Sequence, residues 1–341
     1  MDNKVEKILN AFSGQCLAVV GDVMLDKYVW GSSNRISQEA PVPVVLVKKE
    51  TYVPGGAANV ARNVLSLGGS ASIFGVIGDD IEGVQLSQCL VNDGVDTCTL
   101  LKSKSRATTV KTRVLAGNQQ VVRIDREETD DVSRGERRNM LKTLEAVLKS
   151  GKINAVILED YAKGLFSKSF MEAVVELCRK YKVMSALDPH PRNPYNIKGL
   201  TFMTPNRNEA FALAGVKYAS GCGNPLQDAP LLNVASRLMR KWQPQYLLIT
   251  LGAEGMALFS KDKSKPLHIP TQARQVFDVS GAGDTVMATM MLALMSGASP
   301  DVAAQIANQA AGIVVGRVGT SAIEIDVLKE TINATIQSPL C

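Results

Sequence analysis

A glycine-rich turn followed by a carboxylate occurs in segment 276–286, VFDVSGAGDTV, at the start of an apolar helical stretch. Glycines let the backbone turn sharply, so the N–H groups of Gly281, Ala282 and Gly283 can converge on one point. Such a helix start suits an anion, including a phosphoryl group in transfer. We predict that Asp284 takes a proton from a substrate hydroxyl as phosphorus is attacked. The alternative is that Asp284 only caps the helix.

A glycine pair opens a second helix in segment 53–69, VPGGAANVARNVLSLGG. Glycine and alanine there allow a ligand or another backbone to come close. Asn59, in the first turn, offers both a donor and an acceptor to sugar hydroxyls. The alternative is a tightly packed helix of small residues with Asn59 facing solvent.

Polar side chains also follow predicted strands. Asp22 ends the first strand, and Asp160 and Lys163 follow another in LEDYAKG (158–164). In open α/β sheets ligands bind at the carboxyl ends of the strands, so we predict that the carboxylates hold hydroxyls and Lys163 a phosphate. A single aspartate after a strand forms a turn about as often as it binds a ligand. Several strands ending in polar groups favour a binding site.

Two further sequence patterns each allow both a binding role and a purely structural role. In TPNRNEA (204–210), Asn206 and Glu209 can hold a hydrated Mg²⁺ and nucleotide phosphates, although alone the pair is better explained as a helix cap. Basic residues gather between positions 102 and 126, where some can grip a second substrate phosphate. A solvated strand face is the alternative for this group, which comprises Lys102, Lys104, Arg106, Lys111, Arg113, Arg123 and Arg126.

Composition excludes several classes. The chain has 341 residues, 45% hydrophobic and 21% charged, with a net charge of +5, which is too mild for a nucleic-acid binder. Six scattered cysteines and two histidines do not make a zinc site, and no P-loop or dinucleotide fingerprint occurs. The N-terminus lacks a signal-peptide core, and the apolar segment 276–300 carries two aspartates. We therefore expect a cytoplasmic protein without a membrane span.

Short β-branched runs alternate with amphipathic stretches, which predicts parallel strands joined by crossover helices. The predicted strands are 17–22, 72–78, 155–160, 183–189, 202–206 and 246–252, and the predicted helices are 55–67, 134–150, 167–181, 228–241, 282–297 and 300–315. Segment 42–53 lacks a helical period, and 109–125 is typical of a hairpin around Gly117-Asn118, a type II′ turn. We expect one α/β domain over residues 1–341, an open, mostly parallel sheet flanked by helices, with a small β lid from about 31–53 and 107–125.

Together these motifs resemble the ribokinase-like (PfkB) sugar kinases. GGAANVA (55–61), the N-x-x-E element (206–209) and DVSGAGDT (278–285) are similar to that family's signatures and stand in the same order, within about 15–325. The last signature usually opens with Asp-Thr, whereas here it is Asp278-Val279. The sequence is also similar to the kinase domain of bifunctional heptose enzymes of bacterial lipopolysaccharide synthesis, in GDVMLDKYVWGSSNRISQEAPVPVV (21–45), NQQVVRID (118–125), DYAKG (160–164) and VGRVGTS (315–321).

The resemblance implies a role for each matching residue. Asp284 is expected to be the catalytic base, with the amides of Gly281, Ala282 and Gly283 as the anion hole. ATP and Mg²⁺ are expected at Asn206, Arg207, Asn208, Glu209, Thr250, Gly252, Gly255 and Asn308, with Glu209 on Mg²⁺ directly or through water. The sugar is expected at Asp22, Gly55, Gly56, Asn59, Asp160 and Lys163, and its 7-phosphate at Arg123. Asp278 and the 314–319 loop are candidates for a monovalent cation such as K⁺.

The resemblance further implies ATP-dependent phosphorylation of O1 of D-glycero-D-manno-heptose 7-phosphate, giving the 1,7-bisphosphate for ADP-heptose synthesis. The chain has no H-x-G-H motif, so we expect no adenylyltransferase domain and an adenylyl step in another protein. Similar lids dimerise, so a homodimer is expected. The alternatives are a PfkB kinase for another sugar, sugar phosphate or nucleoside, and a sugar-phosphate-binding regulator that has lost catalysis.

Overall fold

A sheet of eight strands forms the centre of the computed structural model, which describes residues 3–117, 119–221, 223–263, 265–273, 276–317, 319 and 321–337. The strand order is β14-β13-β12-β11-β10-β9-β1-β4. Six strands run parallel: β1 (Cys16–Gly21), β4 (Ser70–Phe74), β9 (Ala155–Glu159), β10 (Met184–Asp188), β11 (Phe202–Met203) and β12 (Tyr246–Thr250). An antiparallel edge follows, made of β13 (Met256–Ser260) and β14 (Leu267–Ile269).

Helices cover both faces of this sheet, so its strands are apolar on both sides. The first face packs against α1 (Asn3–Asn10), α2 (Ala57–Ser66), α3 (Ile81–Asn92), α8 (Ala282–Met295), α9 (Pro300–Val314) and α10 (Ile325–Gln337). The second face packs against α4 (Arg134–Lys149), α5 (Lys168–Tyr181), α6 (Arg207–Ala214) and α7 (Ala229–Trp242). α8 is buried continuously over residues 284–294, as expected for a helix that is hydrophobic all round.

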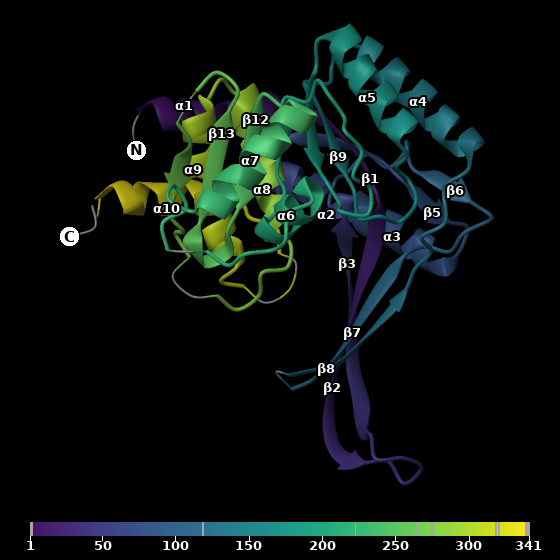
Figure 1. Cartoon of the computed structure of the whole chain (residues 1–341). Helices are drawn as coiled ribbons and strands as arrows, with labels where there is room; N and C mark the ends of the chain where they lie inside the picture. The colour runs from purple at the N-terminus through teal and green to yellow at the C-terminus, as the bar shows by residue number, and fades with distance from the viewer. Residues whose placement is uncertain are drawn as a thin grey trace.

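A second sheet projects from this body, as Figure 1 shows below α3. Its order is β3-β2-β7-β8, from β2 (Val23–Ile36), β3 (Pro43–Gly56), β7 (Val110–Ala116) and β8 (Gln119–Arg126). The register of β7 with β8 confirms the predicted hairpin, although Asn118 of its turn lies outside the described residues. We refer to these four strands as the projecting sheet.

The fold class is confirmed, and the structure differs from the predicted elements at several points. Run 72–78 divides into β4 and β5 (Val76–Gly78), which pairs with β6 (Leu101–Ser103). Run 202–206 contains only two strand residues, because Pro205 has no N–H to donate and Asn206 already caps α6. The sequence patterns did not predict α1, α3, α10, β13, β14 or the strand conformation of residues 23–30, whereas residues 31–36 lie within the predicted β lid. Short 3₁₀ turns lie at Ala11–Gly14 and Gly252–Glu254.

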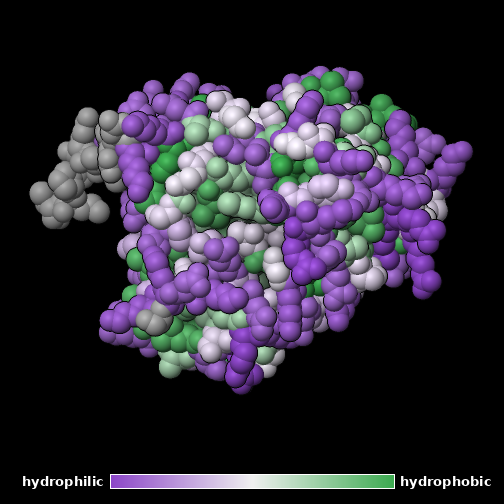
Figure 2. All heavy atoms as spheres, turned by 90° about the horizontal axis from the view of Figure 1, so that it is seen from above, coloured by the Kyte–Doolittle hydropathy of each residue, from purple (hydrophilic) through white to green (hydrophobic). Residues whose placement is uncertain are grey.

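Seen from above, the surface carries hydrophilic side chains over most of its rim, and hydrophobic side chains form small groups between them (Figure 2). None of the helices in the described ranges is long and apolar enough to cross a membrane.

Candidate active site

The predicted site residues come from neighbouring strand ends. Asp22 follows β1 and Asp160 follows β9, which pair in parallel, and Asp188 ends β10 beside Glu159. Asn206 follows β11 and forms a bridge with Thr250 at the end of β12. Parallel strands place all of these carboxyl ends on one edge of the sheet.

Asp284 lies in the first turn of α8, whose N-cap is Gly281 in the left-handed region at φ 79°. The residue is 6% exposed, and its carboxylate accepts two short hydrogen bonds, from Asn59 Nδ2 at 2.6 Å and from the Tyr161 hydroxyl at 2.6 Å. No side-chain cap bond occurs at the start of α8 within the described residues, so the interpretation of Asp284 as a simple helix cap is wrong. Burial raises the pKa of Asp284, and its two hydrogen bonds lower it.

The helix α2 begins against the end of β1 and carries Asn59 to Asp284. Gly56 has φ 59°, and a Cβ there would lie 2.5 Å from the carbonyl oxygen of Asp22, so glycine is required. Asn59 is 1% exposed, which shows that the solvent-facing alternative is wrong. Asn63 and Thr285 join the same two helices through a hydrogen bond of 3.0 Å. The two glycine-led helices thus bring their first turns together.

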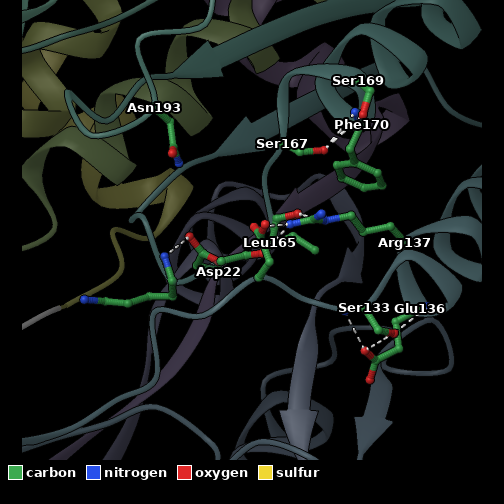
Figure 3. A network of polar contacts seen from close by, with 12 residues as sticks. Asp22, Ser133, Glu136, Arg137, Leu165, Ser167, Ser169, Phe170 and Asn193 are labelled. Atoms are coloured by element: carbon green, nitrogen blue, oxygen red, sulfur yellow. Dashed lines mark hydrogen bonds and ion pairs between the residues drawn. The ribbon is translucent and has the colours of Figure 1, made fainter.

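The carboxylate of Asp22 holds a loop rather than standing free. One of its oxygens accepts the backbone N–H groups of Tyr161 (2.9 Å) and Lys163 (3.1 Å). On the other side of this loop, Arg137 donates to the carbonyl of Leu165 at 2.7 Å, so that Leu165 lies between Asp22 and Arg137 in Figure 3. Burial raises the pKa of Asp22, and the backbone N–H groups oppose this shift.

Asp160 and Lys163 are both paired inside the site. Asp160 accepts the N–H of Ala162 at 2.8 Å, as a turn former does, and both of its oxygens lie 2.9 Å from Asn193 Nδ2. Burial raises the pKa of Asp160 to about 7. The Lys163 ammonium forms an ion pair with Glu127 at 2.7 Å. A substrate that uses Lys163 must therefore compete with, or share, this ion pair.

Two further carboxyl groups lie beneath the start of α8. Glu159 and Asp188 are registered neighbours on β9 and β10, so their side chains lie on the same face of the sheet. Asp188 Oδ2 would lie 3.9 Å from a Cβ added at Gly283. Glu159 is fully buried, and neither of its carboxyl oxygens has a hydrogen-bond partner among the described residues. Burial raises the pKa of Glu159 and of Asp188 well above the usual range of a carboxyl group. Repulsion from neighbouring carboxylates, including Asp284 and Glu209, acts in the same direction.

The predicted nucleotide residues group around the start of α6. Asn206 and Glu209 form a capping box with bonds of 3.0 and 2.8 Å, which confirms the cap interpretation. Asn208 is exposed beside them, whereas Arg207 is buried in an ion pair with Asp228. The nucleotide role of these residues stays a prediction.

The other predicted nucleotide residues have identifiable structural roles. At Gly255 a Cβ would meet the Ile269 carbonyl oxygen at 2.1 Å, and Gly252 has φ 60°. Asn308 donates to the carbonyl of Pro270 at 2.7 Å. These contacts support the loops beside Thr250, and none of them excludes a nucleotide.

A hydrated Mg²⁺ fits the chemistry of this edge. Glu159, Asp188 and Glu209 supply the hard oxygen donors that Mg²⁺ prefers, and the two oxygens of Glu159 have no partner among the described residues. Within those same ranges no three such side chains converge closely enough to hold a metal ion by themselves. Mg²⁺ usually keeps several waters and binds one or two carboxylates together with substrate phosphates, which suits a partial protein shell.

The projecting sheet turns one basic side chain toward the site. Arg113 lies 2.5 Å from Asp26 and over the ring of Tyr28, and Asp26 acts electrostatically on Asp284. Arg123 is the registered neighbour of Arg113, but it is exposed and paired with Asp125 at 3.0 Å. The solvated-face alternative therefore describes Arg123 in this structure.

Asp278, the candidate for a monovalent cation, already has two backbone donors. It accepts the N–H groups of Ser280 at 2.9 Å and Gly319 at 3.1 Å. These donors and Arg113 hold its pKa below the usual range although burial opposes them. The remainder of the proposed 314–319 loop is only partly within the described residues, so its cation role stays a prediction.

Tyr161, Glu159 and Asp188 were not singled out as site residues from the sequence, whereas Arg113 belonged to the basic group considered for a second substrate phosphate. Tyr161 and Glu159 stand inside LEDYAKG, between or beside residues that were chosen there. Their position could have identified them. Tyr161 and Glu159 stand at the same strand end as Asp160 and Lys163, so they were expected to lie in the same part of the fold. Asp188 ends the predicted strand 183–189, so the argument used for Asp22 applied to it equally.

The fold and the site together define a carbohydrate kinase. The pfkB family carbohydrate kinase model matches residues 15–326, and the chain belongs to that family, whose members are phosphotransferases with an alcohol acceptor. Its relatives include the bifunctional protein HldE of Desulfatibacillum aliphaticivorans, 42% identical over 94% of this chain, and that of Geobacter sulfurreducens, 40% identical over 95%. This chain covers 64% of the length of each of these two relatives.

Solved structures show the same fold. Ribokinase of Arabidopsis thaliana, complexed with ribose and ATP, has a TM-score of 0.68 at 20% identity and covers 93% of this chain and 98% of its own. Phosphofructokinase-2 of Escherichia coli, in complex with potassium, has a TM-score of 0.76 at 16% identity and covers 94% of this chain and 98% of its own.

Proposed function

We propose that this chain transfers a phosphoryl group from ATP to O1 of D-glycero-D-manno-heptose 7-phosphate. The observation that carries the proposal is the position of Asp284, a buried carboxylate at the glycine-led start of α8 with Asn59 beside it. The motif resemblance to heptose kinase domains and the similarity to HldE proteins support the choice of sugar.

Asp284 is proposed to accept the O1 proton. Although burial raises its pKa, the Asn59 amide and the Tyr161 hydroxyl stabilise its charged form. Each carboxylate oxygen has a second lone pair, so the substrate hydroxyl can still donate to Asp284. In the first turn of α8 the N–H of Ala282 donates to the carbonyl of Val279 at 3.2 Å. The N–H groups of Gly281 and Gly283 are therefore the proposed donors to the charge that develops on the transferred phosphoryl group.

The acceptor sugar is proposed to bind between α2 and the strand ends. The side-chain oxygen of Asn59, Oδ1, is buried and has no partner among the described residues, so it is free to accept a sugar hydroxyl. The pair of glycines at 55 and 56 leaves room beside Asp26, since a Cβ at Gly55 would lie 2.6 Å from its Oδ2. Arg113 faces the same space from the projecting sheet, and we add it to Arg123 as a candidate for the 7-phosphate.

ATP and Mg²⁺ are proposed to bind between the start of α6 and the end of β12. Glu209 and Asn206 lie there with Thr250, and both Asp188 and Glu159 interact electrostatically with Glu209 and with Asp284. When bound, Mg²⁺ neutralises charge on the phosphates during transfer. A bound cation would favour the ionised forms of Glu159 and Asp188, and so oppose the burial and repulsion that raise their pKa.

The projecting sheet is proposed to act as a lid over the sugar, within a single domain. β2 leaves the body directly after Asp22, and β3 returns at Gly55 and Gly56, so a movement of the sheet is coupled to the sugar site. A closed lid excludes water from the transfer.

The proposal is tested by ADP release from Mg-ATP with heptose 7-phosphate, ribose and fructose 6-phosphate in parallel. Turnover on heptose 7-phosphate alone is the expected result. Turnover only on ribose or fructose 6-phosphate would assign the same chemistry to another sugar. Binding of heptose 7-phosphate without ADP release from any of the three would indicate a regulator and contradict the proposal.

A further inference from the structure

Tyr161 connects a fixed loop to the carboxylate that is proposed to be the base. Its hydroxyl donates to Asp284 Oδ1 at 2.6 Å, while Asn59 Nδ2 donates to Oδ2 at the same distance. The two donors come from the 160–165 loop and from α2, which are separate segments of the chain. A carboxylate held at both oxygens cannot rotate without breaking one of these bonds.

The loop that carries Tyr161 is fixed from several directions. Asp22 accepts its N–H groups at Tyr161 and Lys163, and Arg137 donates at 2.7 Å to the carbonyls of Gly164 and Leu165. Ala162 has a positive φ of 54°, a conformation that persists in a non-glycine residue only where the surroundings enforce it. The hydroxyl of Tyr161 is thus presented to Asp284 by a preformed loop.

We propose that Tyr161 is a positioning residue for phosphoryl transfer, which fixes the Asp284 carboxylate and stabilises its charged form. The inference rests on the proposed role of Asp284. It also assigns a different task to Asp22, which acts through the loop and Tyr161 rather than only through the sugar. No atom of Tyr161 needs to exchange a proton in this role.

The charges around Asp284 make its ionisation sensitive to the hydrogen bond from the Tyr161 hydroxyl. The titratable groups facing the Tyr161–Asp284 pair are Asp26 of β2, Glu159 of β9 and Asp188 of β10, all of them acidic. Burial together with Asp26 favours the protonated form of Asp284, so its ionisation depends on the two hydrogen-bond donors. Removing the Tyr161 hydroxyl should therefore raise the pKa of Asp284 further.

The test compares wild type with Tyr161→Phe, with Tyr181→Phe as the matched control. The Tyr181 hydroxyl, at the end of α5, contacts Glu145 of α4 at 3.2 Å, away from the site. The titration of Asp284 is followed by carbon NMR in protein labelled at the aspartate carboxyl carbons, with Asp284→Asn to assign the signal. In parallel, kcat and KM for the sugar are measured against pH.

In Tyr161→Phe we expect the Asp284 midpoint to rise by about one pH unit or more. The acid limb of kcat should move by the same amount, with less than about a threefold change in KM, since a bond to the base rather than to the sugar is lost. Tyr181→Phe should titrate like wild type. An unchanged Asp284 midpoint in folded Tyr161→Phe would overturn the proposal.

A second substitution keeps the test decisive if the phenylalanine variant fails to fold. Replacement of Tyr161 alone by 3-fluorotyrosine keeps the ring and makes the hydroxyl a stronger donor, so the Asp284 midpoint should fall. A midpoint that does not fall would contradict the proposal. If the wild type turns over no sugar, the proposed function fails, whereas the NMR titration still decides whether Tyr161 controls Asp284.

Discussion

Asp160 is a carboxyl group of this site whose protonation changes near neutral pH. It lies directly after β9, is 6% exposed, and receives hydrogen bonds from Asn193 and from the N–H of Ala162. Burial nevertheless outweighs these bonds and raises its pKa to about 7. The pKa values of Glu159 and Asp188 are also raised, well above the usual range. The folded site therefore keeps protons that the unfolded chain would release at neutral pH.

Stability should therefore depend on pH through Asp160. An unfolded aspartate has a pKa of about 3.9, so between about pH 4 and 7 only the folded state keeps the proton. The contribution to stability is complete below pH 4 and is lost as the pH rises through 7. Over this range we expect the free energy of unfolding of wild type to fall more than that of Asp160→Asn, by up to roughly 4 kcal/mol.

Urea denaturation of the two proteins at several pH values measures this difference. Because Glu159, Asp188 and Asp22 remain in both proteins, the difference between the two curves reports Asp160 together with its repulsion of these neighbours. Parallel curves between pH 4 and 7 would show that Asp160 is ionised in the folded protein.

At the scale of elements, α2 is placed by the glycines at its start. Gly56 has a positive φ and lies against the Asp22 carbonyl, whereas Gly68, just beyond the other end of α2, has φ 91° and no atom within 4 Å of an added Cβ. Both glycines have a positive φ, but Gly56 also has a ψ of −137°, outside the left-handed helical region, and only Gly56 lies against another part of the backbone. This difference allows a matched comparison.

Gly68→Ala should lower the free energy of unfolding by about 1 kcal/mol, the cost of a left-handed alanine. Gly56→Ala should lower it by several kcal/mol, since the Cβ must also displace the backbone at Asp22. Kinase activity should survive in Gly68→Ala and fall strongly in Gly56→Ala, because Asn59 moves with α2. Thermal or chemical denaturation and an ADP-release assay measure both effects. Equal losses in the two variants would contradict the close-packing argument.

The parallel core could be predicted from the sequence because its elements have strong local patterns. The runs at 17–22, 155–160 and 246–252 are short and apolar, and the helices at 134–150 and 167–181 have clear amphipathic periods. β2 was harder, because residues 31–34, GSSN, interrupt its pattern and its partners lie far along the chain. Its strand conformation depends on pairing with β3 and β7, which local propensity does not contain.

The site was predictable in its residue types and less so in its contacts. Asp284, Asn59, Asp22 and Asp160 were chosen from their residue types and their positions at predicted helix starts and strand ends, before the family resemblance was considered. All four are buried near one edge of the sheet. That Asp22 binds a loop, and that Tyr161 reaches Asp284, depends on contacts between residues 123 and 139 positions apart. Such long-range contacts leave no period or motif in the sequence.

At the scale of the whole molecule, the projecting sheet is the surface on which we expect another protein chain to bind. It stands away from the body, and its large hydrophobic side chains include Leu46 at 68% exposed, Ile36 at 62% and Ile124 at 57% (Figure 1). Edge strands with exposed apolar residues are prone to pair with another chain. We expect two copies of this chain to associate through these sheets.

Leu46→Asp should shift the protein from dimer toward monomer, because it places a charge on the expected contact. Val91→Asp is the control, since Val91 is 54% exposed on α3, outside the projecting sheet. Sedimentation velocity over a range of protein concentrations distinguishes the species. A wild type that is monomeric at every concentration, or a Leu46→Asp variant that stays dimeric, would contradict association through the sheet.

The central claim is that Asp284 is the base of a sugar kinase, and kcat for ADP release with heptose 7-phosphate tests it most directly in wild type and Asp284→Asn. Asparagine keeps the size of the side chain and a carbonyl oxygen for one of the two donors, but it cannot take the O1 proton. We predict that kcat falls by about 10² or more, with the fold and ATP binding retained. Equal kcat in the two proteins would show that Asp284 only supports the packing of α2 against α8.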